Sequence, residues 1–271
     1  MQDCGTVMLK ITVISLIFLF LAVLMTMTGR GGGNFYVLTF VLAGVPMHEA
    51  AATGQFVLFT SALTAAAVFR KARALSVPLA LFIGGLTAVM AFLGGFVAHQ
   101  FSGMQLKIVF SILLAIAGIA MLLTVQESKK DPVRRMGYWN LKAGDQLYVI
   151  NLWLAAPLAM LTGFFSGMVG VSGGSFLVPL MVLVCGVPMR IAVGTASAMV
   201  AATALAGFAG HALHGDFDPG WGLPIAVITI LGGLVGGSIA LRTKPKYLKM
   251  LFAVTTLLAA MVMLVNAFWA A

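Results

Sequence analysis

Residues 29–34 read Gly-Arg-Gly-Gly-Gly-Asn and are followed at 44–47 by Gly-Val-Pro-Met. Later in the chain, Gly-Val-Ser-Gly-Gly-Ser at 170–175 is followed by Gly-Val-Pro-Met at 186–189. Each pair encloses a short apolar piece, 33–44 and 175–186, which as a helix would be only about 18 Å long. That length is too short to cross a bilayer comfortably. The pattern therefore predicts two half-helices, each entered through glycines and ended by Gly-Val-Pro.

The chain around these half-helices is nearly free of charge. Of its 271 residues, 61% are apolar and only 8% charged, whereas about a quarter are charged in soluble domains. Eight further apolar runs are long enough to span a bilayer. They cover 7–28, 48–69, 76–98, 104–125, 148–169, 189–213, 221–241 and 246–269. We expect an all-α polytopic membrane protein with an N-terminal transmembrane repeat at 1–125, a cytoplasmic linker at 126–146 and a C-terminal transmembrane repeat at 147–271.

Lysine and arginine are concentrated in three short stretches, 70–73, 127–145 and 242–249. Short loops rich in these residues stay cytoplasmic. The stretch 211–218 has neither residue, so we expect it outside, with both termini, in the cell inner (plasma) membrane. The net charge is +9, but the lysines and arginines that supply it lie between apolar spans and do not form a continuous basic face. This pattern argues against a nucleic-acid partner.

The two halves match each other at an offset of 142 residues. Nine of 24 positions are identical between 31–54 and 173–196, including Gly-Val-Pro-Met. The basic loop at 70–73 corresponds to the loop that we expect outside, so the halves are predicted to be inverted repeats. Inverted repeats are typical of secondary transporters, whose site lies near the bilayer midplane where broken helices meet.

The half-helix N-termini are the candidate site. A helix N-terminus exposes free N–H groups and about half a positive charge, and glycines let an anion approach the backbone. We expect Arg30 to supply charge, and Thr53, Gln55, Thr195 and Ser197 to supply hydrogen bonds. The full set of expected substrate-binding residues is Arg30, Gly31, Gly32, Gly33, Asn34, Thr53, Gln55, Ser172, Gly173, Gly174, Ser175, Thr195 and Ser197, with Arg190, His48 and His211 as second-rank candidates.

Each of these assignments has a simpler alternative. The glycines permit close helix crossing in membranes, an arginine can snorkel to an interface, and Thr or Ser can bond its own helix backbone. Histidines and Glu49 are the groups whose titration would couple transport to protons. The sequence leaves these alternatives open.

Two other functions compete with a carrier. The tetrapeptide at 170–173 resembles the glycine-flanked serine of rhomboid-type intramembrane proteases, with Ser172 as nucleophile and His211 as base. The first half has Arg30 where this serine stands, which argues against that reading. An uncoupled anion channel is the second alternative. We expect a transporter and not an enzyme, with no cofactor, no metal site and no disulfide between Cys4 and Cys185.

The second half resembles a known family. Gly167–Ser175, Val178-Pro179, Gly186–Pro188 and Ala192–Thr195 are similar to the signature of the sulfite exporter TauE/SafE family. The resemblance implies a multi-pass inner-membrane permease that exports small sulfur-containing anions such as sulfite, sulfoacetate or other organosulfonates. The expected partners are a small anionic substrate and the lipid bilayer. Protons as coupling ion and a second copy of the chain are further candidates that the sequence leaves open.

Overall fold

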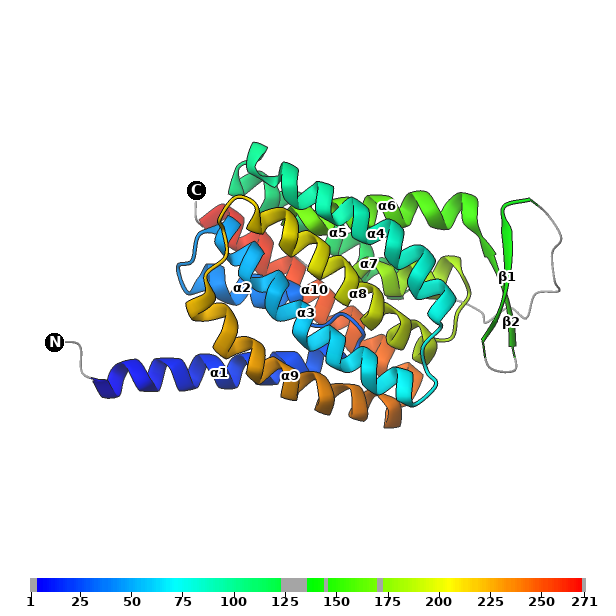
Figure 1. Cartoon of the computed structure of the whole chain (residues 1–271), viewed down its shortest axis with the longest axis horizontal. Helices are drawn as coiled ribbons and strands as arrows, with labels where there is room; N and C mark the ends of the chain where they lie inside the picture. Colours follow the sequence, from blue (N-terminus) through cyan, green and yellow to red (C-terminus); the bar gives the residue numbers. More distant parts are fainter. Residues whose placement is uncertain (1–3, 123–135, 144–145, 170–172, 270–271) are drawn as a thin grey trace.

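The computed structural model describes residues 4–122, 136–143, 146–169 and 173–269 and is helical throughout its main body (Figure 1). The first half contains α1 (Cys4–Met27), α2 (Gly33–Leu42), α3 (Met47–Lys71), α4 (Val77–Val97), the short η1 (Ala98–Gln100) and α5 (Gly103–Leu122). The second half contains α6 (Leu152–Val169), α7 (Gly174–Pro179) continued by η2 (Leu180–Val184), α8 (Met189–Ala212), α9 (Pro219–Arg242) and α10 (Pro245–Trp269). Six of the described helices are long and apolar enough to cross a membrane. The expected all-α polytopic fold, with four long helices and one short helical segment in each half, is confirmed.

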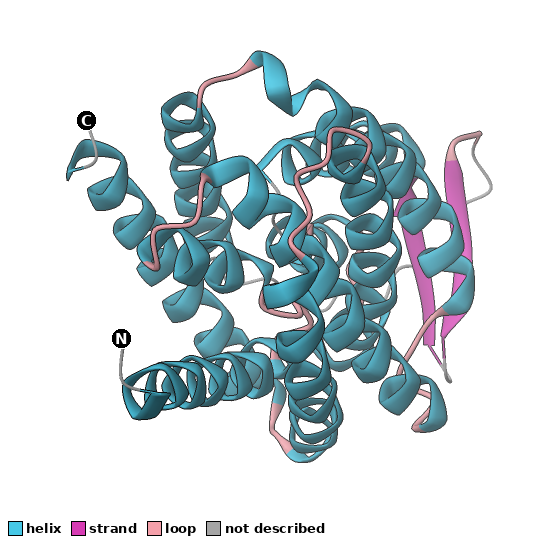
Figure 2. Cartoon of the chain, turned by 60° about the vertical axis from the view of Figure 1, so that its left-hand side comes forward, coloured by secondary structure: helices cyan, strands magenta, loops and turns pink. Residues whose placement is uncertain are grey.

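One expected helix boundary is wrong. The apolar run at 148–169 was predicted to be helical from its start, but α6 begins at Leu152. The preceding residues form an antiparallel hairpin of β1 (Tyr138–Ala143) and β2 (Gln146–Asn151), in which Tyr138 pairs with Asn151. A short apolar run containing Val149 and Ile150 suits a strand as well as a helix, so hydropathy alone does not separate the two. The hairpin projects from one end of the helical body, away from both termini (Figures 1 and 2).

The long helices pack closely around α3 and α8, which contact each other and are flanked by α9 and α4, respectively. Glycines at the contacts allow this close approach. A β-carbon on Gly95 of α4 would lie 2.8 Å from the Gly207 carbonyl oxygen of α8. The offset of 142 residues relates these two glycines to Gly237 of α9 and Ala65 of α3. A β-carbon on Gly237 would lie 3.6 Å from the Ala65 α-carbon. The packing partners thus recur with the two halves exchanged, while the opposite orientation of the halves in a membrane stays a prediction.

The described basic loops lie at the hairpin end of the molecule. Arg70 and Lys71 end α3 and Arg73 follows it. Arg242 ends α9, and Lys244 lies between α9 and α10. All five side chains are exposed. The opposite end carries the start of α3, η1 and the loop between α8 and α9 (Figure 1). This distribution is the one expected if the hairpin end faces the cytoplasm.

Candidate functional site

The two glycine-rich turns meet inside the helical body. A β-carbon on Gly174, at the start of α7, would lie 2.8 Å from the Arg30 α-carbon and 3.0 Å from the Gly29 carbonyl oxygen. It would also lie 2.8 Å from the side chain of Val200, in the middle of α8. A β-carbon on Gly31 would contact the same valine at 3.4 Å. Segments more than 140 residues apart in the sequence are therefore brought together here, and only glycine leaves room for the contact.

Hydroxyl groups of α3 and α8 lie beside these turns. The Ser61 hydroxyl donates a hydrogen bond to the Gly31 carbonyl, at 2.9 Å. Thr203, which the 142-residue offset relates to Ser61, lies with its methyl carbon 3.7 Å from the β-position of Gly173. Gly31 adopts a φ of +67°, a left-handed conformation that favours glycine. We call the meeting point of residues 29–33 with 173–175 the glycine crossing.

Arg30 extends from the glycine crossing into neutral surroundings within the helical body. Its side chain is 1% exposed, which speaks against snorkelling to an interface. The guanidinium donates hydrogen bonds from Nε to the Thr28 hydroxyl at 3.2 Å and from Nη2 to the Met25 sulfur at 3.4 Å. Its other described contacts come from α10: the hydroxyls of Thr255 and Thr256, and the ring of Phe252 at 4.5 Å from the guanidinium carbon.

No carboxylate among the described residues pairs with Arg30, because their ion pairs join Asp216 to His99 and His211. A charged arginine at the centre of a membrane helix costs about 3 kcal/mol on insertion scales. Hydroxyl, thioether and aromatic contacts reduce this cost but leave the positive charge without a counter-ion. The arrangement is therefore electrostatically suited to an anion.

Tyr36 adds a polar group to the glycine crossing. Its hydroxyl is buried and lies close to the Ser61 side chain. A β-carbon on Gly32 would lie 2.8 Å from this hydroxyl oxygen. Sequence reasoning missed Tyr36, as it missed Ser61, Thr255 and Thr256, although each is a polar residue within an apolar helix.

Thr53 and Thr195 lie at opposite ends of the molecule, away from the glycine crossing. The Thr195 hydroxyl accepts a hydrogen bond from the Ser76 amide at 2.9 Å, and Thr53 accepts one from the Asp218 amide at 3.4 Å. Thr53 lies eight residues before Ser61 in α3, and Thr195 lies eight residues before Thr203 in α8. Eight residues correspond to about 12 Å of helix. The structure does not gather these threonines around one ligand; it uses them to join the two halves.

Gln55 and Ser197 are buried but engaged within the protein. The Ser197 hydroxyl donates to the Val193 carbonyl of its own helix at 3.0 Å. The Gln55 amide nitrogen donates to the Gly167 carbonyl at 3.3 Å, and its oxygen is buried without a partner. His211 also bonds the Gly167 carbonyl, through Nε2 at 3.0 Å.

The remaining expected residues are divided between the glycine crossing and the two ends of the molecule. Ser175 is buried at the start of α7, and Asn34 lies in the first turn of α2. Arg190 is exposed at the start of α8, and His48 stacks on His99 at the opposite end of the molecule. Ser172 falls outside the described residues, so the geometry does not place the alternative Ser172–His211 pair.

Comparison with known proteins gives the family. The model of the sulfite exporter TauE/SafE family matches residues 14–263. The chain belongs to this family. It is similar to the probable membrane transporter protein YunE of Bacillus subtilis (strain 168), with 22% identity over 86% of this chain and 89% of the relative. It also resembles a probable membrane transporter protein of Xylella fastidiosa (strain 9a5c), with 28% identity over 55% of this chain and 51% of the relative. No solved structure matches.

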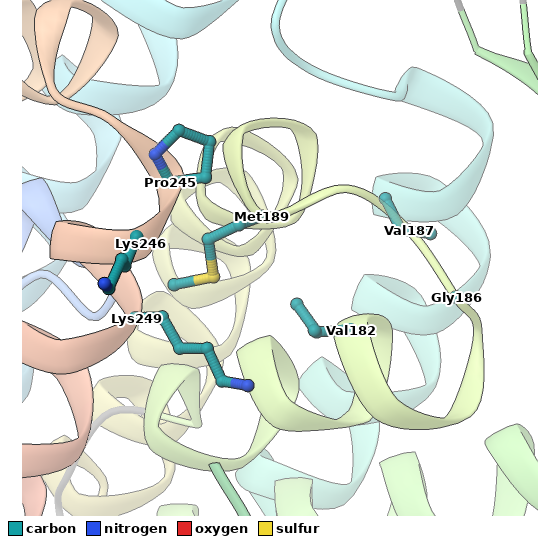
Figure 3. Close-up of a pocket in the computed structure, with 7 residues that line it drawn as sticks. All are labelled: Val182, Gly186, Val187, Met189, Pro245, Lys246 and Lys249. Carbon is teal, nitrogen blue, oxygen red and sulfur yellow. The ribbon is translucent and has the colours of Figure 1, made fainter. Parts of the chain in front are cut away.

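This TauE/SafE transporter also has a pocket at its basic end, between η2, the start of α8 and the start of α10 (Figure 3). The pocket is lined by Val182, Gly186, Val187, Met189, Pro245, Lys246 and Lys249. Figure 3 shows both lysines on the α10 side, with the Lys249 side chain extending away from that helix. Two ammonium groups at this end would raise the local concentration of anions.

Proposed function

We propose that this TauE/SafE transporter exports small sulfur-containing oxyanions, such as sulfite, sulfoacetate or other organosulfonates, and that it binds them at Arg30 beside the glycine crossing. The observation that carries the proposal is the buried Arg30 guanidinium, whose described partners are all neutral. An anion at this point supplies the missing counter-charge.

Sulfite and sulfonate groups suit these donors. Three oxygens share the negative charge, so one group accepts hydrogen bonds from a guanidinium and from backbone N–H groups together. The N-termini of α2 and of the helical segment Gly174–Val184 begin at the crossing. The buried Tyr36 hydroxyl supplies a further donor. Binding requires the hydroxyls of Thr255 and Thr256 to give up part of their contact with Arg30.

The position of Arg30 suits alternating access. Its α10 partners, Thr255 and Thr256, lie near the middle of their helix, as Ser61 and Val200 do in α3 and α8. In inverted-repeat transporters, the site lies near the midplane and one bundle rocks against the other. Rocking of the two halves about the α3–α8 contact would expose the glycine crossing to each side in turn.

Thermal unfolding of the purified full-length protein tests the site. A ligand at one hundred times its Kd stabilises the folded state by about 2.7 kcal/mol. We expect sulfite or sulfoacetate to raise the melting temperature of the wild type, and chloride at equal ionic strength to have no such effect. Arg30→Gln should remove the rise. Arg190→Ala, which removes an exposed arginine at the start of α8, should keep it. A folded Arg30→Gln protein with an unchanged rise would move the site elsewhere.

Transport by proteoliposomes tests the function itself. We expect flux of the bound anion to saturate with concentration, as a carrier requires. Flux that rises linearly over the same range would favour a channel. Cleavage of a membrane peptide that is lost in Ser172→Ala, without anion flux, would favour the protease.

A further inference from the structure

All four histidines of the chain gather with Asp216 at the end opposite the basic loops. His48 lies at the start of α3, His99 in η1, His211 at the end of α8 and His214 just beyond it. The rings of His48 and His99 stack with centroids 4.8 Å apart, and those of His99 and His214 are 4.1 Å apart. His99 Nε2 lies 2.7 Å from Asp216 Oδ2. Three segments distant in sequence thus place four imidazoles and a carboxylate together.

The hydrogen bonding of His211 identifies the nitrogen that faces this cluster. Its Nε2 lies 3.0 Å from the Gly167 carbonyl oxygen. A carbonyl oxygen only accepts hydrogen bonds, so Nε2 carries the proton and Nδ1 of the neutral ring carries the lone pair. That Nδ1 is buried without a hydrogen-bond partner and lies 3.9 Å from Asp216 Oδ2. A lone pair and a carboxylate oxygen therefore face each other, an arrangement that a cation between them would stabilise.

We propose that His99 Nε2, His211 Nδ1 and Asp216 Oδ2 bind a divalent transition-metal ion of the zinc class. One ligand atom from each of these residues lies within 4.8 Å of those of the other two. In a tetrahedral zinc site with bonds of 2.0–2.1 Å, ligand atoms are about 3.3 Å apart. The 2.7 Å distance from Asp216 Oδ2 to His99 Nε2 would increase by about 0.6 Å, and the 3.9 Å distance from the same oxygen to His211 Nδ1 would decrease by about 0.6 Å. Imidazole and carboxylate ligands without thiolate suit zinc and its neighbours in the first transition row.

The surroundings of the three ligands have the features of a metal site. A metal-binding histidine commonly donates its second ring N–H to a backbone carbonyl, as His211 does to Gly167. The side chains of His99 and Asp216 are 33% and 16% exposed, so the ion has a path from water. The buried His211 side chain closes the inner side. The fourth position is then left for water on the open side.

Metal binding would join the two halves of the transporter. His99 belongs to the first half, and His211 and Asp216 belong to the second. An ion held by all three links η1 to the loop between α8 and α9. The site does not depend on Arg30 or on the identity of the transported anion.

Zinc content of the untagged full-length protein tests this proposal. After treatment with a chelator, the protein is equilibrated with zinc chloride, passed over a desalting column and analysed by elemental mass spectrometry. We expect about one zinc per chain for the wild type and, for His99→Gln and Asp216→Asn, affinity lower by at least about tenfold. Asp218→Asn is the matched control, because this carboxylate lies in the same loop but caps α9 through the Gly220 amide at 2.8 Å.

Cobalt as a spectroscopic probe gives a second readout. Tetrahedral Co²⁺ with nitrogen and oxygen ligands absorbs in the visible range, and this band should be present in the wild type and Asp218→Asn but absent in the two ligand variants. Gel filtration and melting without metal show whether each variant is folded. A wild type that binds no zinc, or folded His99→Gln and Asp216→Asn proteins that bind it as tightly as the wild type, would overturn the proposal.

Discussion

Gly174 lies so close to the backbone of Arg30 that a β-carbon on it would come within 2.8 Å of the Arg30 α-carbon. Neither backbone can move away easily, because Val200 occupies the adjacent space at the same distance. We therefore expect Gly174→Ala to lower the free energy of unfolding by about 1–3 kcal/mol, the range for overpacking a close-packed interior. Thermal unfolding in detergent measures the change.

The matched control for Gly174→Ala is Gly85→Ala. Gly85 lies within α4, and apart from its chain neighbours and the backbone of its own helix no heavy atom lies within 4 Å of its β-position. Alanine there should be neutral or should stabilise the helix by up to about 1 kcal/mol. Equal melting temperatures for the two variants would show that the glycine crossing is not tightly packed.

The hydroxyls of Thr255 and Thr256 are predicted to stabilise the buried guanidinium of Arg30. Thr255→Val and Thr256→Val keep the side-chain shape but remove a hydrogen bond to a charged group. Each should cost about 1.5–3 kcal/mol of unfolding free energy. Thr162→Val is the control, because that hydroxyl bonds the Leu158 carbonyl of its own helix.

A double-mutant cycle separates this effect from general packing. In an Arg30→Met background, Thr255→Val should cost much less, because no guanidinium remains to be left unpaired. A coupling energy of about 0.5–3 kcal/mol is expected for groups in contact. Full additivity of the two substitutions would contradict the proposed contact.

Thr53 and Thr195 are predicted to stabilise opposite ends of the molecule independently. Each accepts a backbone N–H at the start of a helix in the other half, from Asp218 and Ser76, respectively. Replacing either by valine should cost about 1 kcal/mol, with the larger effect at Thr195, whose bond is shorter. The double variant should be additive within about 0.5 kcal/mol. Ser197→Ala is the control, because it loses only a hydrogen bond within its own helix. A strong deviation from additivity in the double variant would show that the two ends are coupled in the folded state.

The orientation in the membrane is tested by accessibility of single cysteines in a background without Cys4 and Cys185. Leu213 and Lys244 are exposed at opposite ends of the helical body. Because lysine-rich loops stay cytoplasmic, a membrane-impermeant maleimide should label Leu213→Cys in intact cells and Lys244→Cys only after permeabilisation. The reverse pattern would invert the topology.

The hydropathy of the apolar runs and the Gly and Pro residues at their ends were sufficient to predict the helices. The bilayer requires long apolar segments, so their number and approximate bounds are visible in the residue order. The short helices after Gly32 and Gly173 follow in the same way, because the glycines permit the turn and Gly-Val-Pro ends the segment. The hairpin at 138–151 was not predicted, since its strands gain their hydrogen bonds from each other and the run at 146–151 has no distinguishing pattern.

The residues that surround Arg30 could not be predicted from the sequence, because they come from segments that are distant along the chain. Arg30 was identifiable as a lone arginine among apolar segments, because charge in a membrane span is costly. Its partners Thr255 and Thr256 are more than 220 residues away in sequence, and threonines in apolar helices usually bond their own backbone. Only the packing of α10 against the first half selects them.

By itself, the sequence determined that this is a polytopic helical membrane protein with two related halves and two glycine-entered half-helices, because these features follow from local hydrophobicity and backbone freedom. The tertiary structure alone decided which polar groups converge. It brought Arg30 to neutral hydroxyls and placed Thr53 and Thr195 at separate ends. It also gathered His99, His211 and Asp216 into one cluster, because such neighbours are chosen by the way whole helices pack and not by their spacing along the chain.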